Sequence, residues 1–553
     1  MALLNLSRSI DAQGIGTRCE RERKGKIMNN LRRILFASVS LLSVCIILST
    51  VPVGVVADSH DIPPPFCSPW PISSNTTAVC PFHSNDRIIG TYYFYWYDKS
   101  SNTHIIDPST KTDALTDHPA TLDQFSWKSV EWHKKQLSDM EAAGIDMALM
   151  VFWGAPSEHD RGTRLHWSYE GLPPLVEARD QLLKEGKHPP FIGLIYDTST
   201  LRLNSWKEQV DLTTQRGKEW FYSTVRDFFS CIPQRHWATI DGRPIFLLYN
   251  AGFASNYDQS VIDYTRANFA KDFGRDPYIV PQFSWIYHNV RGDSFCVWGG
   301  SSGLKHAGIS ELGPGFDDSA AIHRKRVVVP RDNGKLYEDS WRNFLRRPTP
   351  IVMVETWNEF HEGTDICESR EYGRRYIDLT RKYVSLFKQG KTDTERSGKY
   401  EGAGKVDIVL GQQPSQNGVE LIQADDGATA PVTVKGSEAV ALANPRSHYI
   451  YFAVDESFKW ADAMNLKLAV EYYDSSQGDF TVQFDGNHPS SHFYGAYTPT
   501  GQTVKLTGTG SWKTAEFELR EARMWNLENR NADFRLVVRA PEFAVHSVSV
   551  RRR

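Results

Sequence analysis

Residues 351–366 read IVMVETWNEFHEGTDI, four apolar residues followed by a dense group of polar ones. An uninterrupted apolar run rich in β-branched side chains is typical of a strand buried on both faces of a parallel sheet. The residues that follow it within eight positions include Glu355, Trp357, Asn358, Glu359, His361 and Glu362. Carboxyls this close repel one another and are costly to bury, so we expect them to serve a function. The structural alternative is a salt-bridge cluster with Arg374 and Arg375.

Seven more apolar, β-branched or aromatic runs precede this strand, and segments of helical period separate them. The eight runs begin near Ile88, Met147, Phe191, Pro244, Tyr278, Ser294, Gly308 and Ile351. Helices are expected over residues 127–143 and 214–229, and over a last apolar stripe from Tyr372 to Phe387. Eight such repeats predict an α/β fold, a (β/α)8 TIM barrel over residues 87–387. The sixth and seventh runs give the weakest signal.

An open doubly wound sheet is the main alternative fold for this part of the chain. Sheets of that kind bind nucleotides through a glycine-rich loop after the first strand. The first run is IIGTYYFYW, and no glycine-rich loop follows it. The sequence therefore favours the barrel.

A second domain is predicted after the barrel. Residues 388–405 lack large aliphatic side chains and are typical of a linker. Short alternating runs such as LKLAVEYYD and DFRLVVRA then predict an all-β sandwich, jelly-roll-like, over residues 406–553. Such a domain serves either as a carbohydrate-binding module or as a structural buttress, and the sequence leaves both open. The candidates for sugar contact are Trp460, Tyr494, Tyr497 and Trp525.

Residues 1–57 are expected to be an export leader. Residues 31–57 combine two arginines, a long apolar run and the ending Val55-Val56-Ala57, which is typical of a cleaved signal peptide. The run is also long enough for an uncleaved signal anchor, the only contact with a membrane that we expect. Both alternatives predict a secreted, periplasmic or cell-surface protein.

Residues 58–86 form a Pro-rich segment ahead of the barrel. Its two cysteines, Cys67 and Cys80, can staple the segment in an oxidising compartment. The other cysteines beyond the leader are expected to be buried thiols: Cys231, Cys296 and Cys367. A glycosylation sequon begins at Asn75.

The composition excludes several classes of protein. Hydrophobic residues make up 40% and charged residues 23%, which is ordinary for a globular chain. The formal net charge is -3, and no long Lys/Arg cluster lies outside the leader, so nucleic acid is not an expected partner. Aromatic residues make up 12%; most serve core packing, but sugar rings also stack on such faces. We expect a monomer without a cofactor.

A metal-dependent hydrolase is a further alternative. Its ligands would be Asp317, Asp318, His323, His361 and Glu362. No HExxH or other close-spaced ligand set supports this alternative, and we expect no metal.

Two carboxyls in different surroundings are what glycosidic cleavage requires. One protonates the departing oxygen, and the other helps to form the new bond at the anomeric carbon. If Glu359 and Glu362 flank one tight turn, both reach the mouth of the barrel. His361 lies between them, where it either binds the substrate, orients an acid or packs as a satisfied histidine.

The stretch WNEFHEGTDI resembles the W-N-E-W-H-E-G-T motif of glycoside hydrolase family 99, the endo-α-mannosidase family, which is related to the family 71 α-1,3-glucanases. Weaker matches occur in the same order at residues 92–97 (YYFYWY), 143–154 (AGIDMALMVFWG) and 313–326 (GPGFDDSAAIHRKR). The resemblance covers residues 87–387.

The resemblance implies a retaining, endo-acting hydrolase of an α-linked polysaccharide or glycan, either α-mannan-like or an α-glucan. It implies that Glu359 deprotonates the sugar 2-hydroxyl to form a 1,2-anhydro sugar. Glu362 is then the acid/base that serves the leaving group and afterwards water. Phe360 stands where the motif has tryptophan, and residues 367–369 also depart, so the sugar stays open. The alternative is a non-catalytic carbohydrate-binding surface protein on the same barrel.

The side chains of the sugar site are expected to follow the strands, because barrel active sites lie at the carboxyl ends of the strands. Tyr93, Trp153 and Tyr249 end strands one, two and four, and Asp197 follows strand three. The full set of expected substrate contacts is Tyr93, Tyr95, Trp153, Asp197, Tyr249, Trp357, Asn358 and His361.

Overall fold

The structure, a computed structural model, describes residues 81–154, 166–204, 207–321, 325–393, 398–444, 447–488 and 492–553. The expected leader, most of the Pro-rich segment with Cys67 and Cys80, the sequon at Asn75 and His323 lie outside these residues. Among the described helices, none is long and apolar enough to span a bilayer.

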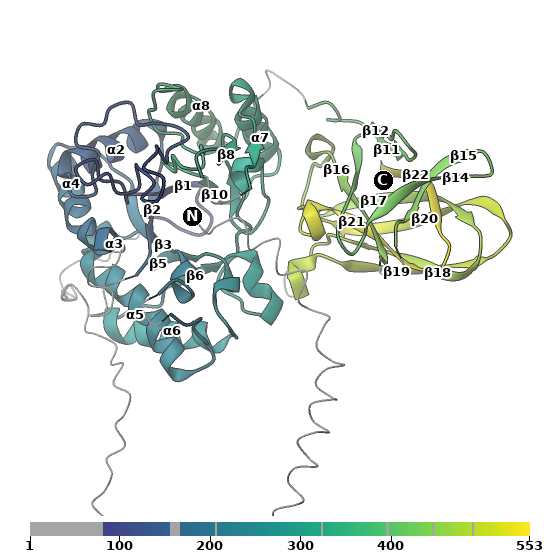
Figure 1. The fold of residues 1–553 in the computed structure, drawn as a ribbon, viewed down its shortest axis with the longest axis horizontal. Coiled ribbons are helices and arrows are strands. Elements are labelled where there is room, and N and C mark those ends of the chain that lie inside the picture. Colours follow the sequence, from purple (N-terminus) through teal and green to yellow (C-terminus); the bar gives the residue numbers. More distant parts are fainter. Residues whose placement is uncertain are drawn as a thin grey trace, which may run out of the picture. The chain divides into compact units, whose positions relative to one another are not determined.

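Seven parallel strands form the centre of the first domain (Figure 1). They are β1 (Ile88–Tyr93), β2 (Met147–Phe152), β3 (Phe191–Tyr196), β5 (Arg243–Leu248), β6 (Tyr278–Pro281), β7 (Ser310–Leu312) and β10 (Ile351–Val354). Their order is β6-β5-β3-β2-β1-β10-β7, which runs along the chain and brings the first and last strands together. Seven of the eight predicted runs are therefore confirmed as strands.

The eighth run, at residues 294–297, closes the ring without forming a regular strand. Cys296 makes a parallel bridge to Gln282, directly after β6. On its other side the amide of Ile309, just before β7, donates to the carbonyl of Phe295 at 2.9 Å. Trp298 and Gly299 then adopt positive φ values of 65° and 103° and turn the chain away. The sheet is therefore a closed barrel, which excludes the doubly wound alternative.

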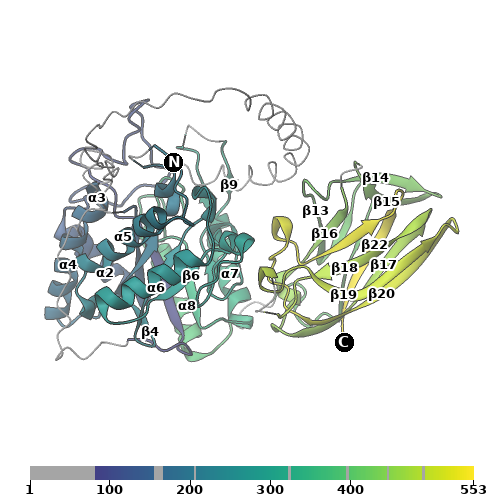
Figure 2. The ribbon, with the colours of Figure 1, turned by 90° about the horizontal axis from the view of Figure 1, so that it is seen from below.

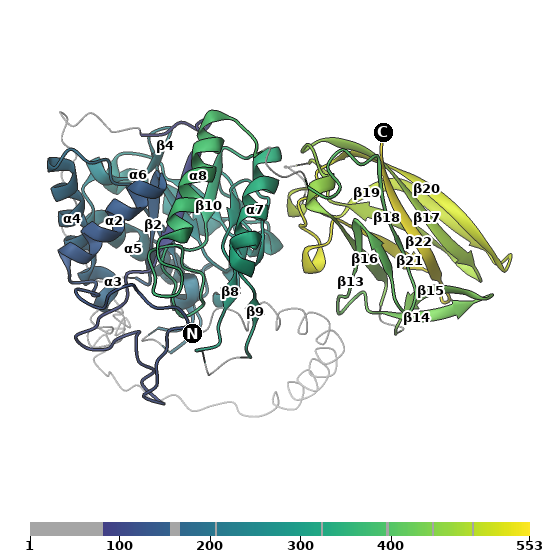
Figure 3. The same ribbon diagram turned by 90° about the horizontal axis from the view of Figure 1, so that it is seen from above.

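Among the described residues, helices surround these strands (Figures 1 and 3). They are α2 (Val130–Ala143), α3 (His166–Glu170), α4 (Leu172–Lys184), α5 (Gln215–Cys231), α6 (Ser260–Phe273), α7 (Lys335–Arg346) and α8 (Arg375–Gln389). The predicted helix over 127–143 begins later because the Ser129 side chain caps it, accepting from the amide of Trp132. Gly144 ends it in the left-handed conformation at φ 84°.

Two glycines show which side chains face the barrel interior. A Cβ added at Gly90 of β1 would lie 2.3 Å from Met353 Sδ of β10. One added at Gly193 of β3 would lie 2.3 Å from Leu149 Cδ2 of β2. Because side chains alternate along a strand, the inward positions near the carboxyl ends are Tyr92, Trp153, Asp197, Tyr249 and Glu355.

Residues 405–552 form a sandwich of two antiparallel sheets (Figure 2). The first holds β11 (Lys405–Val409), β12 (Ser415–Asn417), β14 (Thr429–Val434), β15 (Ser437–Leu442), β17 (Met464–Asp474), β20 (Ser511–Ala522) and β22 (Ala544–Arg552). The second holds β13 (Val419–Ile422), β16 (Tyr449–Val454), β18 (Gln477–Phe484), β19 (Thr498–Thr507) and β21 (Phe534–Arg539). Alternate residues of β17 are buried, as Leu466, Leu468 and Val470 show. The predicted fold, a TIM barrel followed by a β-sandwich, is confirmed.

Three very short strands complete the description: β4 (Thr239–Ile240), β8 (Phe316–Asp317) and β9 (Val328–Val329). β4 extends the barrel sheet beside β5, and β8 pairs with β9 ahead of α7.

The aromatic residues expected to bind sugar on the sandwich are mostly buried against other groups. The ring of Tyr494 stacks on that of Phe295 at 3.8 Å, and Trp525 is only 6% exposed. The guanidinium of Arg535 lies over the ring of Tyr497 at 4.1 Å. Only Trp460 of the four candidates is well exposed, at 38%. The expectation of a sugar platform at these positions is therefore wrong for Tyr494 and Trp525, which serve packing.

The cysteines divide in a way that the sequence did not indicate. Cys296 and Cys367 are buried free thiols, as expected. Cys231, at the end of α5, is disulfide-bonded, so the expectation of a buried thiol there is wrong. A disulfide partner depends on chain folding, which cysteine spacing alone does not give.

Candidate active site

The turn after β10 carries both candidate acids and is closed at its base. The amide of Thr356 donates to the carbonyl of Thr364 at 3.0 Å, and the two threonine hydroxyls lie 2.9 Å apart. The Thr356 hydroxyl also accepts from the amide of Glu359. Gly363 adopts φ 53°, a left-handed conformation that costs glycine little. Glu359 and Glu362 therefore belong to one turn, as expected.

A buried arginine fastens this turn to the rest of the barrel. Arg331 is 8% exposed and donates to the carbonyl of Gly363 at 3.0 Å. The same guanidinium pairs with Asp117 and Asp365, both at 2.9 Å, and lies over the ring of Tyr372 at 4.2 Å. Although burial by itself lowers the pKa of Arg331, the two carboxylates outweigh it and hold the pKa above its ordinary value. The turn is thus held by a permanent charge.

Glu359 has one engaged oxygen and one without a partner. Its Oε1 lies 2.7 Å from His361 Nδ1 and accepts from the amide of His361 at 3.2 Å. Its Oε2 is buried and has no hydrogen-bond partner among the described residues. The residue is 2% exposed. A buried polar atom without a partner costs about 1–3 kcal/mol, so this oxygen needs a reason to be there.

A second pair of carboxyls lies deeper in the barrel. Glu355, the first residue after β10, accepts from the amide of Gly299 at 2.9 Å through Oε2. Glu311 of β7 is fully buried and accepts hydrogen bonds from the Tyr92 hydroxyl and the Trp298 amide. Burial, and then the charge of Glu311, raise the pKa of Glu355 well above its ordinary value. The charge of Glu362 raises the pKa of Glu355 as well.

Aromatic rings connect the motif turn with the end of β3. The ring of Trp96 lies 5.6 Å from that of His361 and 5.7 Å from that of Trp153. Trp153 donates from Nε1 to Asp197 Oδ2 at 2.6 Å. Burial raises the pKa of Asp197. Trp153, Asp197 and His361 are therefore connected through Trp96 on one side of the barrel mouth.

Tyr249 lies at the mouth in a separate aromatic group. Its ring is 5.0 Å from that of Trp298, which in turn lies 4.9 Å from that of Tyr92. Tyr92 points across the interior toward Glu311 of β7. The prediction of Tyr249 as a mouth residue therefore agrees with its inward position.

Four of the expected substrate contacts point elsewhere. Tyr93 directs its hydroxyl to His133 of α2 at 3.0 Å, and Tyr95 donates to the carbonyl of Ser168 ahead of α4. Trp357 donates to Gln136 of α2 at 2.7 Å. The Asn358 amide pairs with both backbone groups of Phe94, at 2.8 and 2.7 Å. The expectation of sugar contacts at Tyr93, Tyr95, Trp357 and Asn358 is therefore wrong.

Two physical reasons explain the difference. These side chains either lie on the outer face of the barrel wall or have their hydrogen-bonding groups occupied by the backbone. The inward neighbour of Tyr93 is Tyr92, which was not among the expected substrate contacts. Glu311, Trp298, Tyr97 and Arg331 were also missed. A signal existed for Glu311, since it is a lone acid within the apolar run GISEL.

Arg374 and Arg375, the arginines expected to pair with the acids, bind other groups. Arg374 pairs with Asp139 and Glu368, and Arg375 binds Asn333. In the described part of the chain, neither arginine forms an ion pair with Glu355, Glu359 or Glu362. The salt-bridge explanation by these two arginines is therefore wrong. The described residues contain no group of three or more His, Cys, Asp and Glu that could hold a metal.

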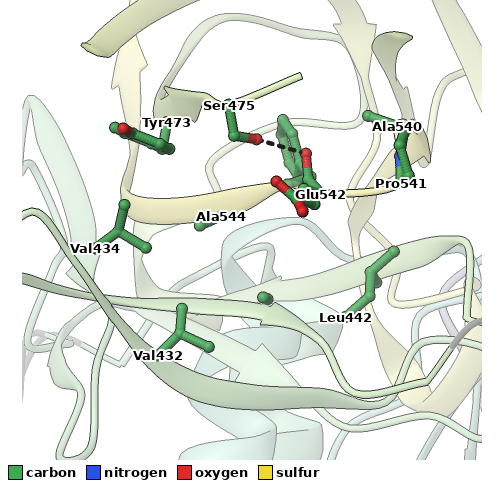
Figure 4. A pocket seen from close by; sticks show the side chains of 11 residues that line it. Val432, Val434, Leu442, Tyr473, Ser475, Ala540, Pro541, Glu542 and Ala544 are labelled. Atoms are coloured by element: carbon green, nitrogen blue, oxygen red, sulfur yellow. Dashed lines mark hydrogen bonds between the residues drawn. The ribbon is translucent and has the colours of Figure 1, made fainter. Parts of the chain in front are cut away.

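The sandwich carries a hollow of about 340 Å³ on its first sheet (Figure 4). Its walls are mostly aliphatic, with Val432, Val434 and Leu442 on one side and Pro541 on the other. Tyr473 and Glu542 also line it, and Ser475 donates to the carbonyl of Glu542 at 2.8 Å. None of the four aromatic residues predicted to bind sugar lines this hollow.

Comparisons with known proteins give one family and several solved structures. The model of a family described as "Domain of unknown function (DUF5010)" matches residues 77–396. No curated protein matches the chain. The family 99 endo-α-mannosidase from Bacteroides thetaiotaomicron, solved with bis-tris-propane, is 16% identical with a TM-score of 0.41, and the match covers 55% of this chain and 98% of that one. It belongs to the family that the motif resembles.

Two further solved structures complete the comparison. One described as a glycoside hydrolase-like protein is 16% identical with a TM-score of 0.39, covering 57% of this chain and 97% of that one. The C-terminal family 6 carbohydrate-binding module of the laminarinase LamC from Zobellia galactanivorans is 12% identical with a TM-score of 0.15, covering 27% and 99%.

Proposed function

The chain belongs to the family described as a domain of unknown function, DUF5010, and we propose that this domain is a glycoside hydrolase whose catalytic carboxyls are Glu359 and Glu362. One observation carries the proposal. Glu359 is buried at the carboxyl end of the barrel strands, with one oxygen held by His361 and the other without a partner among the described residues. A carboxyl in that state is suited to exchange a proton with a bound molecule.

The proposed substrate is an α-linked polysaccharide or glycan, α-mannan-like or an α-glucan, cleaved internally with retention. The resemblance of residues 357–366 to the family 99 motif supports this class. The partly exposed rings of Trp153 and Trp298 support it as well, because the weakly positive C–H face of a sugar packs on aromatic rings.

The proposed chemistry uses the two acids in turn. Glu359 takes the proton of the sugar 2-hydroxyl, whose oxygen attacks the anomeric carbon to form a 1,2-anhydro sugar. Glu362 gives its proton to the departing oxygen as the glycosidic bond breaks. Glu362 then takes a proton from water, which attacks the anomeric carbon, and Glu359 returns its proton to the 2-oxygen. Both carboxyls end as they began, so the cycle balances.

We also propose that the protein is exported. The composition of residues 31–57 supports export, and so does the disulfide at Cys231, because such bonds persist in oxidising compartments. Fractionation of the producing cells tests the proposal. Recovery only from the cytosol would contradict it.

The test of the activity is release of reducing ends. Purified protein is incubated with α-mannans, α-1,3-glucans and other α-linked polysaccharides, alongside Glu359→Gln and Glu362→Gln. Glu368→Gln is the matched control, since that acid pairs with Lys135 and Arg374 outside the site. We expect cleavage by wild type and control, and none by the two site variants. Sugar binding without cleavage by wild type would favour the non-catalytic alternative instead.

A further inference from the structure

We propose that His361 is a positioning residue for Glu359, and that the loop between β1 and α2 fixes its ring through the carbonyl of His104. The inference deepens the proposed function, because it says how Glu359 is kept ready to act as a base. It concerns a histidine for which the sequence left three roles open.

The Nε2 atom of His361 contacts the loop between β1 and α2. This nitrogen lies 2.8 Å from the carbonyl oxygen of His104. A carbonyl oxygen can only accept, so Nε2 must carry a hydrogen whenever this contact exists. The loop thereby excludes the tautomer in which only Nδ1 is protonated.

The Nδ1 atom of His361 has two oxygen neighbours. Glu359 Oε1 lies at 2.7 Å and the Tyr97 hydroxyl at 3.5 Å. Tyr97 donates its single proton to the carbonyl of Asn358 at 3.1 Å and accepts from the amide of Phe360. Burial, and then the charge of Glu359, raise the pKa of Tyr97, so it stays protonated. The partner of Nδ1 is therefore Glu359.

One proton consequently lies between His361 Nδ1 and Glu359 Oε1. Either the imidazolium donates to a carboxylate, or the neutral ring accepts from a carboxylic acid. In both states Oε1 is occupied and the carboxyl is held in one orientation. Oε2 is left as the oxygen available to a sugar hydroxyl.

The loop that supplies the carbonyl makes a second contact with His361. His104 adopts φ 57°, a left-handed conformation that non-glycine residues seldom take. Its own ring stacks flat on Trp96, with centroids 4.8 Å apart and planes at 2°. Thr116, later in the same loop, donates from its hydroxyl to the carbonyl of His361 at 2.9 Å. The loop therefore contacts His361 at two points, the Nε2 atom of its ring and its backbone carbonyl.

The titratable groups that face the His361 ring come from three segments. Glu359 belongs to the same turn, Tyr97 follows β1, and the His104 ring lies 6.0 Å away in the loop. Of these, Glu359 is the only acid in hydrogen-bond contact among the described residues. The Glu359–His361 contact is therefore the one that can hold the carboxyl in place.

Two substitutions separate the functions of the two ring nitrogens. Asparagine in His361→Asn places an amide near the position of Nδ1 and keeps a donor to Glu359. Glutamine in His361→Gln reaches toward the His104 carbonyl, as Nε2 does, and leaves Oε1 without that donor. His118→Gln is the control, because this histidine of the same loop binds Glu371 and Asp113.

The measurement is kcat/KM across pH on the best substrate. We expect His361→Asn to remain within about tenfold of wild type and His361→Gln to lose about 100-fold, mostly in kcat. The reverse order of activities, or equal activities, would overturn the proposal.

A second measurement tests the proposal without any substrate. Long-range proton–nitrogen NMR spectra of protein labelled with 15N-histidine report which ring nitrogen is protonated, and the signal lost in His361→Asn identifies His361. We expect Nε2 to stay protonated at every pH at which the protein is folded. A bare Nε2 at neutral pH would overturn the proposal even if the protein cleaves glycans. A protonated Nε2 in a protein without activity would instead contradict only the proposed function.

Discussion

Two buried acids, one in each domain, differ in their hydrogen bonding: Asp474 ends a strand, and Glu359 lies in the turn after one. Asp474 is the last residue of β17 and accepts from the amides of Thr507, Gly508 and Thr509 at 2.8, 3.0 and 3.2 Å. Lys513 and two threonine hydroxyls donate to it as well. Glu359, in the turn after β10, has one occupied oxygen and one without a partner among the described residues.

The difference shows how a structural carboxyl is told from a functional one. Burial alone raises the pKa of Asp474, but the donors from Lys513 and Thr509 outweigh it and hold the pKa far below its ordinary value. That acid is permanently ionised and stabilises the folded state. Glu359 keeps one buried oxygen without a partner among the described residues, which is expected where a site is kept ready for a ligand.

The largest effect is expected when Glu359, the buried acid of the barrel, loses its carboxyl. Glu359→Gln should lower kcat by about 10³- to 10⁴-fold, because the proton acceptor is lost. The free energy of unfolding should stay equal or rise, because a neutral amide is easier to bury than a carboxylate with an unpaired oxygen. Initial rates and urea unfolding of the same preparations measure both quantities. A folded variant with the rate of wild type would remove Glu359 from the mechanism.

The next effect tests the anchor of the motif turn. Arg331→Met should lower the free energy of unfolding by about 3–5 kcal/mol, because Asp117 and Asp365 stay buried without their cation. The catalytic rate should fall with it, since the turn that carries both acids loses three of its contacts. Arg375→Met, at an exposed arginine, is the control and should change neither quantity. Urea unfolding measures the free energy of unfolding of both variants. A loss in Arg331→Met no larger than that in Arg375→Met would contradict the role of Arg331 as an anchor of the turn.

A smaller effect is expected at the structural acid of the sandwich. Asp474→Asn should lower the free energy of unfolding by about 2–3 kcal/mol, because hydrogen bonds to a buried charge are lost. The rate per folded molecule should equal that of wild type. Chemical unfolding and initial rates again measure the two quantities. Unchanged stability would show that a buried carboxylate surrounded by hydrogen-bond donors does not for that reason stabilise the fold.

The smallest effect is on acid sensitivity. Glu456 follows β16, and Lys459 and Arg347 lower its pKa from 4.5 to about 2 despite its burial. Its stabilising contribution is therefore present above pH 4.5 and is lost as the pH falls through 2. Glu456→Gln should flatten the decline in stability over that interval. An unchanged slope of unfolding free energy against pH would contradict the ion pair.

Much of this comparison was accessible from the sequence. The eight apolar runs predicted the barrel because each carries its own strand signal. Glu359 and Glu362 were predicted in one turn because they lie only three positions apart in the sequence. Trp153, Asp197 and Tyr249 follow their strands in the inward phase, and their contact with a sugar stays a prediction.

The errors have physical causes. The run YYFYWY at residues 92–97 contains no polar residue that would mark its outer face, so Tyr93 was chosen in place of Tyr92. The phase is set by Gly90, whose missing side chain makes room for Met353 of a strand 263 residues away in the chain. Asn358 looks like a ligand-binding amide, but the backbone of Phe94 occupies it. Such long-range partners leave no local pattern.

The most direct test of the central claim is rescue of a missing carboxyl. Glu359→Ala is assayed for release of reducing ends on the best α-linked substrate, with and without added formate. The account predicts a loss of about 10³-fold in rate and at least a partial recovery with formate, which replaces the carboxylate beside His361. A Glu359→Ala protein that cleaves as fast as wild type without formate would contradict it.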